Sequence, residues 1–254
     1  MKISELLSSS STRIKTGIVL ILAVLFIGYI DSYLIMWIFL GGLLVIALNE
    51  SMILFKMKSD LIYAYTGLIW FAAFFYPSPE DLIFVIAVVY ASILAYTKTL
   101  DKKMFLPLLY PTASFLFLLA LYVEFGVESL LWLLVVVAGA DIGAYFVGKG
   151  LGKHKFCETS PNKTWEGVAG GMVVSAALGT YFALDSLSLF GALFVSVIVA
   201  FASVFGDLFE SYLKREANVK DSGDILPGHG GILDRTDGYL FGGIIMLVLL
   251  RAMI

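Results

Sequence analysis

About nine apolar stretches, each long enough to form a helix, recur along the chain and decide what kind of protein it can be. A helix needs about 20 apolar residues to cross a bilayer, and several of the stretches are shorter. Hydrophobic residues make up 60% of the chain and the mean hydropathy is +0.94, more than a soluble core requires. The stretches lie at about 17–30, 32–48, 61–76, 82–97, 104–123, 129–148, 165–184, 187–206 and 238–254. The sequence therefore predicts an all-α, polytopic integral membrane protein, a helical bundle with about nine transmembrane helices.

The positions of the charged residues set the orientation of these helices. Positively charged loops are retained in the cytoplasm, and successive spans alternate in direction. With the N-terminus inside, every Lys and Arg from Lys2 onward falls on the inner side except Arg251. The outer turns carry acidic residues instead: Asp31, Glu80, Asp81, Glu124, Glu128 and Asp185. The sequence therefore predicts a cytoplasmic N-terminus and a C-terminus on the opposite side.

Polar residues are unevenly distributed between two regions. Residues 1–124 form an N-terminal transmembrane region of about five helices without a dense polar cluster. Residues 125–254 form a second transmembrane region, which we expect to be catalytic, with long cytoplasmic loops at about 149–164 and 207–237. The single cysteine, Cys157, excludes an internal disulfide and a Cys-rich zinc site.

An acid, Asp141, lies within the sixth apolar stretch, in AGADIGAYFVGKGLGKHKF. A carboxylate in hydrocarbon costs roughly 2.5–3.5 kcal/mol on insertion scales, and this one approaches the negative C-terminal end of its own helix. A nearby cation would relieve both costs. The alternative is an Asp that hydrogen-bonds to a neighbouring helix and serves packing alone.

The segment SPNKTWEG combines signals for a helix start with a cation that those signals do not explain. Its Pro-Asn pair favours a turn, Thr164 is a typical N-cap, and an acid at Glu166 is favourable in the first helical turn. Lys163 is unfavourable beside the positive end of a helix unless an anion such as a phosphate binds there. The glycines that follow favour close helix packing: Gly167, Gly170 and Gly171.

The second polar segment starts on a helix that continues beyond the eighth stretch. In FGDLFESYLKR, polar residues at i, i+3, i+4 and i+7 share one helical face: Asp207, Glu210, Ser211 and Lys214. KDSGDILPGHGGILDRTDG follows, with glycines whose backbone N–H groups can approach an anion closely. Its carboxylates and cations suit a magnesium-bound triphosphate. An ordinary solvated connection is the alternative, and Glu210 and Asp224 are the acids that fit it best.

The stretch SYLKREANVKDSGDILPGHGGILDRTD, Ser211 to Asp237, resembles the signature of the phosphatidate cytidylyltransferase (CDP-diacylglycerol synthase) family. The elements S-x-x-K-R, K-D-x-G, L-P-G-H-G-G and L-D-R-x-D occur in the order that the family has. DIGAYFVGKGLGK and SPNKTWEGVAGG also resemble upstream blocks of that family, so the likeness covers most of 141–242 and is weak elsewhere. One departure is Gly238, where the family pattern has a small hydroxyl residue.

The resemblance implies a Mg²⁺-dependent transfer of CMP from CTP to phosphatidate in phospholipid biosynthesis, with one or two metal ions. It implies an active site on the cytoplasmic face of a bacterial-type inner membrane. The metal ligands it implies are Asp207 and Asp234, with Asp221 and Asp141 as further ligands. The catalytic residues it implies, most of them phosphate contacts, are Lys163, Lys214, Arg215, Lys220, Asp221, His229 and Arg235. The residues expected to bind the nucleotide or cofactor are Ser160, Asn162, Lys163, Gly230 and Gly231.

The partners expected are CTP, phosphatidate and the lipid bilayer, with no nucleic acid, and a homodimer is among the oligomeric states left open. Another CTP-dependent membrane lipid enzyme, a CDP-archaeol synthase or a polyprenol kinase, is the nearest alternative, because lipid specificity is not visible in the sequence. An ion-coupled transporter would also carry acids in its helices. Its site would lie near the midplane between inverted repeats, whereas Asp141 and Asp207 lie toward inner helix ends.

Overall fold

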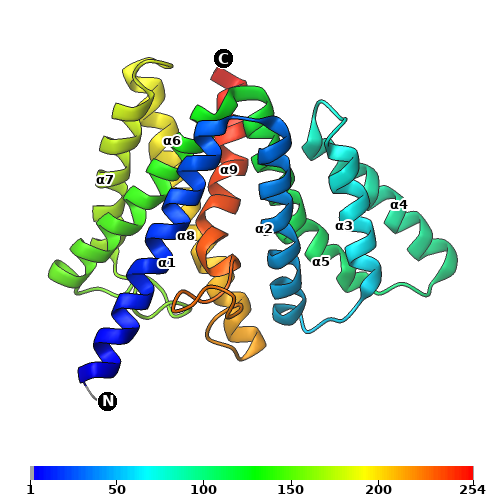
Figure 1. Cartoon of the computed structure of the whole chain (residues 1–254), viewed down its shortest axis with the longest axis horizontal. Helices are drawn as coiled ribbons and strands as arrows, with labels where there is room; N and C mark the ends of the chain where they lie inside the picture. Colours follow the sequence, from blue (N-terminus) through cyan, green and yellow to red (C-terminus); the bar gives the residue numbers. More distant parts are fainter. Residues whose placement is uncertain (1–2, 254) are drawn as a thin grey trace. The chain divides into compact units, whose positions relative to one another are not determined.

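The structure, a computed structural model, describes residues 3–253 and the side chains from Lys15 onward within that range (Figure 1). Met1, Lys2 and Ile254 lie outside the described residues. The prediction that Lys2 is on the inner side therefore also falls outside them. In the described part the regular elements are helices, and extended pairing is limited to two isolated β-bridges. The predicted all-α fold class is confirmed.

Helices follow one another along the chain and cover most of each apolar stretch, although the stretch 104–123 is divided among η2, α5, η3 and the start of α6. The elements are α1 (Ile3–Ile30), α2 (Tyr33–Leu54), α3 (Asp60–Ala73), η1 (Pro79–Asp81), α4 (Leu82–Thr97), η2 (Lys102–Met104), α5 (Phe105–Pro107), η3 (Leu108–Ala113), α6 (Ser114–Leu151), α7 (Trp165–Ala183), α8 (Leu189–Ala217) and α9 (Leu233–Met253).

A single residue inside α6 marks the boundary between two predicted spans. The helical stretch Lys102–Leu151 has 50 residues, far more than the ~20 that one crossing needs. Gly126 has φ 71° and ψ −177°, outside the helical region, and lies between the fifth and sixth apolar stretches. Glycine reaches a positive φ without the steric cost of a Cβ. Gly126 therefore separates two apolar segments at the outer turn that the sequence predicts.

Several helices have the length and composition of membrane spans. Within the described residues, five stretches are long and apolar enough to cross a membrane: Tyr33–Leu54, Pro79–Thr97, Lys102–Leu151, Leu189–Ala217 and Leu233–Met253. The apolar part of α1, Lys15–Ile30, is shorter. These helices support an integral membrane protein, whereas the total of about nine spans and the cytoplasmic N-terminus stay predictions.

The chain forms two compact units. The N-terminal unit consists of Met1–Phe115 and Glu216–Arg235, and the C-terminal unit consists of Leu116–Arg215 and Thr236–Ile254. In the N-terminal unit α2 packs against α1, α3, α5 and η3, and α3 packs against α4 (Figure 1). These units differ from the regions 1–124 and 125–254 that the sequence suggests. The assignment of 1–124 as an N-terminal region and 125–254 as a catalytic region stays a prediction.

Small residues allow close helix contacts in the C-terminal unit. A Cβ at Gly171 of α7 would lie 2.5 Å from the carbonyl oxygen of Ala140 on α6, and one at Gly206 of α8 would collide with the Asp237 carbonyl of α9. Close backbone approach of this kind is typical of helix packing in membranes. The packing role predicted for the glycines at the start of α7 is therefore confirmed: Gly167, Gly170 and Gly171.

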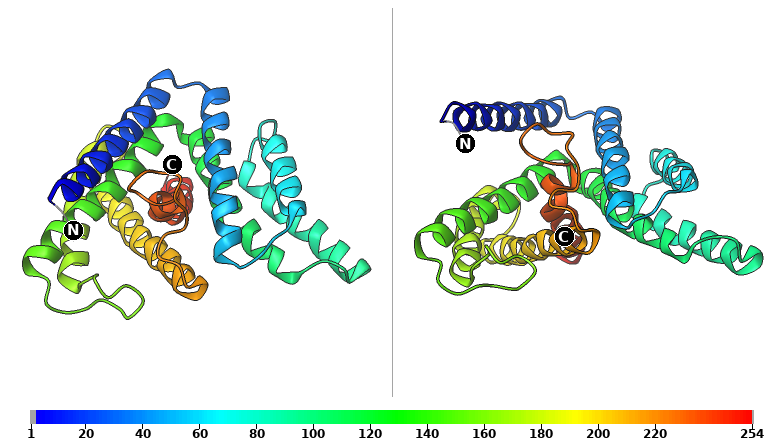
Figure 2. Two further views of the ribbon diagram at one scale, coloured as in Figure 1. Left: turned by 60° about the horizontal axis from the view of Figure 1, so that its bottom comes forward. Right: turned by 90° about the horizontal axis from the view of Figure 1, so that it is seen from below.

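Both polar connections are shorter than the sequence predicts. The first runs from 152 to 164 rather than 149 to 164, because α6 continues to Leu151. The second runs from 218 to 232 rather than 207 to 237, because α8 continues to Ala217 and α9 begins at Leu233. Figure 2 shows this second connection, in orange, as an irregular loop. The polar face that starts at Asp207 is therefore helical, as its residue spacing predicts.

Candidate active site

The connection between α8 and α9 folds into a turn that depends on glycine. Leu226 N donates to Gly230 O at 2.9 Å, and His229 N donates to Leu226 O at 2.8 Å. Gly228 and Gly230 have φ values of 77° and 84°, which glycine adopts without a Cβ penalty. The motif LPGHGG therefore builds a tight loop, which we call the pocket loop (residues 218–232).

A pocket of about 370 Å³ opens within the pocket loop, and every residue of its wall belongs to the N-terminal unit. The wall includes the predicted site residues Lys220, Asp221, His229, Gly230 and Arg235. Cationic side chains next to glycine backbone suit an anion such as a phosphate. The structure thus brings together, around one cavity, five residues that the sequence singles out.

His229 lies at the end of this turn that faces α1. Its carbonyl oxygen accepts a hydrogen bond from Arg235 Nε at 2.9 Å, while Thr16 Oγ1 of α1 donates to Pro227 O at 3.2 Å. The ring atom Nδ1 of His229 is buried and has no hydrogen-bond partner among the described residues. Buried polar atoms without partners are rare in folded proteins. The ring is therefore a candidate to gain a partner when a ligand binds.

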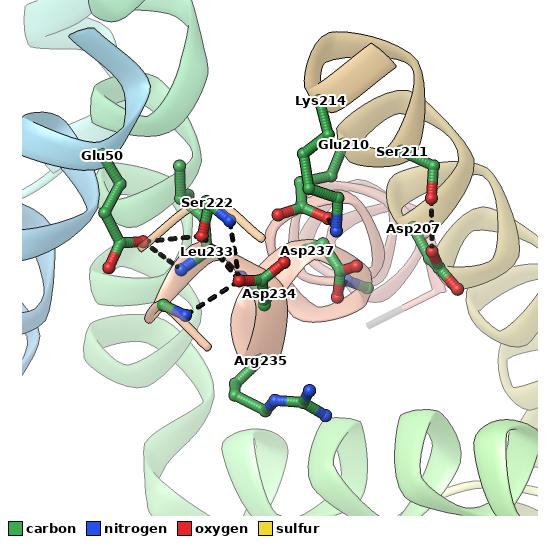
Figure 3. A network of polar contacts seen from close by, with 12 residues as sticks. Glu50, Asp207, Glu210, Ser211, Lys214, Ser222, Leu233, Asp234, Arg235 and Asp237 are labelled. Carbon is green, nitrogen blue, oxygen red and sulfur yellow. Dashed lines mark hydrogen bonds and ion pairs between the residues drawn. The ribbon is translucent and has the colours of Figure 1, made fainter. Parts of the chain in front are cut away.

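Asp234 organises the pocket loop from the first turn of α9. Its Oδ2 accepts hydrogen bonds from Ser222 N at 2.8 Å, Ser222 Oγ at 3.0 Å and Gly231 N at 2.8 Å (Figure 3). This contact occupies one carboxylate oxygen and also the N–H of Gly231. The metal role predicted for Asp234 and the nucleotide contact predicted for Gly231 stay predictions, and the latter would need this hydrogen bond to be shared or broken.

Sequence reasoning missed Glu50 of α2, which lies behind the same loop (Figure 3). Glu50 is 3% exposed, and its carboxyl oxygens accept hydrogen bonds from Ile232 N at 2.9 Å, Leu233 N at 2.8 Å and Ser222 Oγ at 3.0 Å. The hydrogen-bond partners of Glu50 lie in the pocket loop and at the start of α9 and not in residues 1–124, so Glu50 does not stand out as part of a polar cluster in its own region of the sequence. One signal was available, since ionisable residues within membrane helices are rare and mostly functional.

In the C-terminal unit Lys163 reaches Asp207 of α8. Lys163 Nζ lies 2.6 Å from Asp207 Oδ2 and 3.4 Å from Val204 O, and Ser211 Oγ donates to Asp207 Oδ1 at 3.2 Å. The two charged side chains are only 22% and 36% exposed, so solvent screens the pair less than it screens an ion pair on the open surface. A lysine beside the positive N-terminal end of a helix needs a nearby negative charge. Asp207 provides that charge for Lys163.

Asp237 is a further acid that the site prediction leaves out. It interacts electrostatically with Asp207, Asp141 and Lys214, all in the C-terminal unit. Lys214 also forms an ion pair with Glu210 one helical turn earlier, and the Glu210 side chain is 0% exposed. The prediction that Glu210 faces solvent is therefore wrong, because α8 continues through this segment and pairs Glu210 with the lysine at i+4.

The segment SPNKTWEG forms the turn and helix start that the sequence predicts. Thr164 Oγ1 accepts a hydrogen bond from Gly167 N at 3.1 Å and caps α7, and Glu166 lies in the first turn. Asn162 is exposed and Ser160 is half-buried in the turn before the cap. The cap and the first-turn acid are confirmed, whereas the nucleotide contacts of Ser160 and Asn162 stay predictions.

The four predicted metal ligands belong to different units, with Asp141 and Asp207 in one and Asp221 and Asp234 in the other. Within the range 3–253, three or more His, Cys, Asp or Glu side chains are nowhere grouped so that they could hold a metal ion. Magnesium commonly takes one or two protein carboxylates and completes its shell with water and substrate phosphates. The predicted meeting of Asp207 and Asp234 around one ion stays a prediction.

The helices and the pocket loop suit a membrane protein that binds a phosphorylated ligand, because Lys220 and Arg235 line the pocket beside Asp221, Asp224 and glycine backbone. Residues 11–253 match the group of proteins described as the cytidylyltransferase family. A phosphatidate cytidylyltransferase of Helicobacter pylori is 45% identical over 243 residues, which cover 94% of this chain and 91% of that protein. The phosphatidate cytidylyltransferase of Bacillus subtilis is 52% identical over 122 residues, 46% of this chain and 45% of that protein. The chain belongs to the cytidylyltransferase family.

Proposed function

We propose that this chain is a phosphatidate cytidylyltransferase, which makes CDP-diacylglycerol and pyrophosphate from CTP and phosphatidate. The observation that carries the proposal is the 45% identity to the Helicobacter pylori enzyme across 94% of the chain. That span includes the helices, the pocket loop and the Lys163–Asp207 pair. Membership of a cytidylyltransferase family also disfavours the transporter alternative.

The reaction replaces one phosphorus–oxygen bond with another. A phosphate oxygen of phosphatidate attacks the α-phosphorus of CTP, and the bond from that phosphorus to the oxygen bridging to the β-phosphorus breaks. Pyrophosphate leaves with the bonding electrons. Because phosphatidate is already an anion, the chain has to supply in-line positioning and charge neutralisation more than a general base.

The pocket loop offers groups suited to the triphosphate of CTP. Lys220 and Arg235 contribute cationic side chains to the pocket wall, and His229 contributes its ring. Gly230 also lines the pocket, and its φ of 84° lets the loop turn there without a Cβ penalty. These residues would bind the CTP phosphates and neutralise the charge that develops on the leaving pyrophosphate.

Three cations of the C-terminal unit are candidates for phosphate contacts in the same reaction. Lys163 pairs with Asp207 at 2.6 Å, Lys214 pairs with Glu210, and Arg215 is exposed near the end of α8. An ammonium group has three donors, so a lysine held by one acid can still donate to a phosphate. The pairing therefore fixes the position of Lys163 and Lys214 without using up their hydrogen-bonding capacity.

Magnesium is part of the proposal, and the acids of the chain have suitable chemistry for it. Aspartate oxygens are hard donors of the kind that Mg²⁺ prefers. Asp207, Asp237 and Asp141 offer such oxygens in the C-terminal unit, and Asp221 and Asp234 offer them in the N-terminal unit. One or two of these carboxylates would hold the ion, and water and substrate phosphates would complete its shell. When bound, Mg²⁺ would neutralise phosphate charge and polarise the reacting phosphorus.

The membrane setting of the proposal follows from the helix ends. Asp207 lies in the second half of α8, and Asp237 lies in the first turns of α9, so both are toward the ends of the apolar helices at which the pocket loop joins them. The acyl chains of phosphatidate can stay in the bilayer while its phosphate reaches these residues. We place the site on the cytoplasmic side of an inner membrane because the polar connections are rich in Lys and Arg.

The proposed function is tested with purified protein in vesicles that contain phosphatidate, supplied with CTP and Mg²⁺. We expect mass spectrometry to find CDP-diacylglycerol, and pyrophosphate to appear in equal amount. Parallel vesicles carry an isoprenoid ether-lipid phosphate or a polyprenol. A product formed only from one of these lipids, or none with phosphatidate, would contradict the proposal.

Replacement of Lys163 by alanine should lower turnover by about 10²-fold, because a positioned cation next to the reacting phosphates is lost. Asp207 would also lose its partner at 2.6 Å. The melting temperature should change little, since Thr164 and not Lys163 caps α7. Lys153→Ala, an exposed lysine of the same connection, serves as the control and should retain full turnover. Loss of folded protein in Lys163→Ala alone would favour a structural role.

A further inference from the structure

The pocket loop is fixed from behind by one buried side chain of the N-terminal unit. Glu50 accepts hydrogen bonds from two consecutive backbone N–H groups, those of Ile232 and Leu233, at 2.9 and 2.8 Å. It also contacts the hydroxyl of Ser222 at the start of the loop, at 3.0 Å. A single carboxyl group therefore ties together residues on both sides of the turn that forms the pocket.

Ser222 links Glu50 to Asp234. Its Oγ lies 3.0 Å from Glu50 Oε2 and 3.0 Å from Asp234 Oδ2, and it accepts from Asp234 N at 3.3 Å. A hydroxyl has one proton, so Ser222 donates to one of the two carboxyl groups at a time. Backbone N–H groups of Ser222 and Gly231 also donate to Asp234, and those of Ile232 and Leu233 donate to Glu50. The two acids thus hold one shared framework of loop backbone.

The loop backbone is shaped around the Glu50 carboxyl. A Cβ at Gly231 would lie 2.5 Å from both carboxyl oxygens of Glu50, and a Cβ at Gly223 would lie 2.7 Å from Oε1. Real Cβ atoms essentially never come closer than about 3.0 Å, so a side chain at either position would force the Glu50 carboxyl out of its hydrogen-bonded place. The loop backbone at Gly223 and Gly231 therefore packs directly against the Glu50 carboxyl group.

The chain just after α2 holds the beginning of the same connection. Lys56 Nζ donates to Glu216 O at 2.7 Å, in the last turn of α8. Thr16 of α1 contacts Pro227 at the other side of the pocket, as Figure 2 shows for α1 and the orange loop. Lys56 therefore holds the chain just before the pocket loop, while α1 and α2 contact the loop itself.

We propose that Glu50 is a positioning residue for CMP transfer, which sets the shape of the pocket loop and with it the placement of Lys220, His229 and Arg235. Glu50 is absent from the pocket wall, so it acts through the loop and not on the substrate. The inference rests on the proposed function. It gives the N-terminal helices a role in catalysis beyond anchoring the chain in the membrane.

Glu50→Gln tests the proposal, because glutamine keeps the size of the side chain and replaces one accepting oxygen with a donor. That donor would face a backbone N–H or the Ser222 hydroxyl. We expect the KM for CTP to rise about 10-fold or more through misplacement of the loop, with the KM for phosphatidate unchanged. Hydrogen–deuterium exchange across residues 218–233 should be faster than in the wild type.

Two matched controls separate positioning from general stability. Glu80 is a second buried acid of the N-terminal unit, 3% exposed, in the short helix η1 that packs against α3 and α4. Asn49 neighbours Glu50 on α2 and accepts from Tyr63 OH at 3.0 Å. Glu80→Gln and Asn49→Ala should leave both KM values and the exchange of the loop as in the wild type, even where the melting temperature falls.

Unchanged KM for CTP together with unchanged loop exchange in Glu50→Gln would overturn the proposal. A lower fraction of active protein with both KM values unchanged would also overturn the proposal, because loss of folded protein alone gives that result. If Glu50→Gln does not fold, Ser222→Ala is measured in the same way and carries the same expectations. If the wild type makes no CDP-diacylglycerol, the proposed function fails, and the loop exchange still decides whether Glu50 fixes the loop.

Discussion

Replacement of Asp207 by asparagine is expected to lower CMP transfer by roughly 10²–10³-fold, equivalent to several kcal/mol of transition-state stabilisation, while the protein stays folded. Asparagine keeps the shape of the side chain and removes its charge. The ion pair with Lys163 at 2.6 Å would be lost, whereas Ser211 could still donate to the remaining oxygen. Asp237 would also lose a neighbouring charge.

The measurement is the steady-state rate of CDP-diacylglycerol formation in vesicles, with the melting temperature of each variant beside it. Asp185→Asn removes an exposed acid of the same unit between α7 and α8 and should leave the rate unchanged. Equal rates for Asp207→Asn and the wild type would remove Asp207 from the site.

Gly231→Ala is expected to lower activity by about 10²-fold or more, because it changes the shape of the pocket loop. The added Cβ would collide with Ser222 Oγ and lie 2.5 Å from both oxygens of Glu50. Overpacking a buried site of this kind costs about 1–3 kcal/mol, and here the strain falls on the groups that hold the loop.

Gly42→Ala is the matched control, because a Cβ at Gly42 of α2 would meet nothing within 4 Å. It should leave turnover unchanged, and replacement of a helical glycine by alanine should raise stability slightly. The readouts are turnover and loop hydrogen exchange. Full activity in Gly231→Ala would show that the loop can take a shape other than the one described.

The helices were predictable because apolar composition over ten to twenty residues is a local property of the chain. Composition does not predict where a long helix breaks. The break in α6 depends on the single residue Gly126, which has a positive φ. Gly238 is a second case. A small hydroxyl residue is expected here from the family resemblance, but a Cβ would lie 3.0 Å from Val137 Cγ1, so the tight packing around this position accommodates the glycine.

Part of the site was predictable from motif chemistry and part was not. Lys220, His229 and Arg235 lie within sixteen residues of one another, and the structure places them on one pocket wall. Glu50 lies 172 to 183 residues before its partners, so no local pattern could join them. Glu210 was assigned to solvent, because the helical spacing that places it beside Lys214 does not show that this face is buried.

The central claim, that this chain transfers a nucleotidyl group and not a single phosphoryl group, is tested most directly by following the phosphorus atoms of CTP. Purified protein in phosphatidate vesicles receives CTP labelled at the α-phosphorus or, in a separate reaction, at the γ-phosphorus. We predict that the α-label enters the lipid and the γ-label is released in pyrophosphate. Appearance of the γ-label in the lipid would identify a kinase and contradict the account.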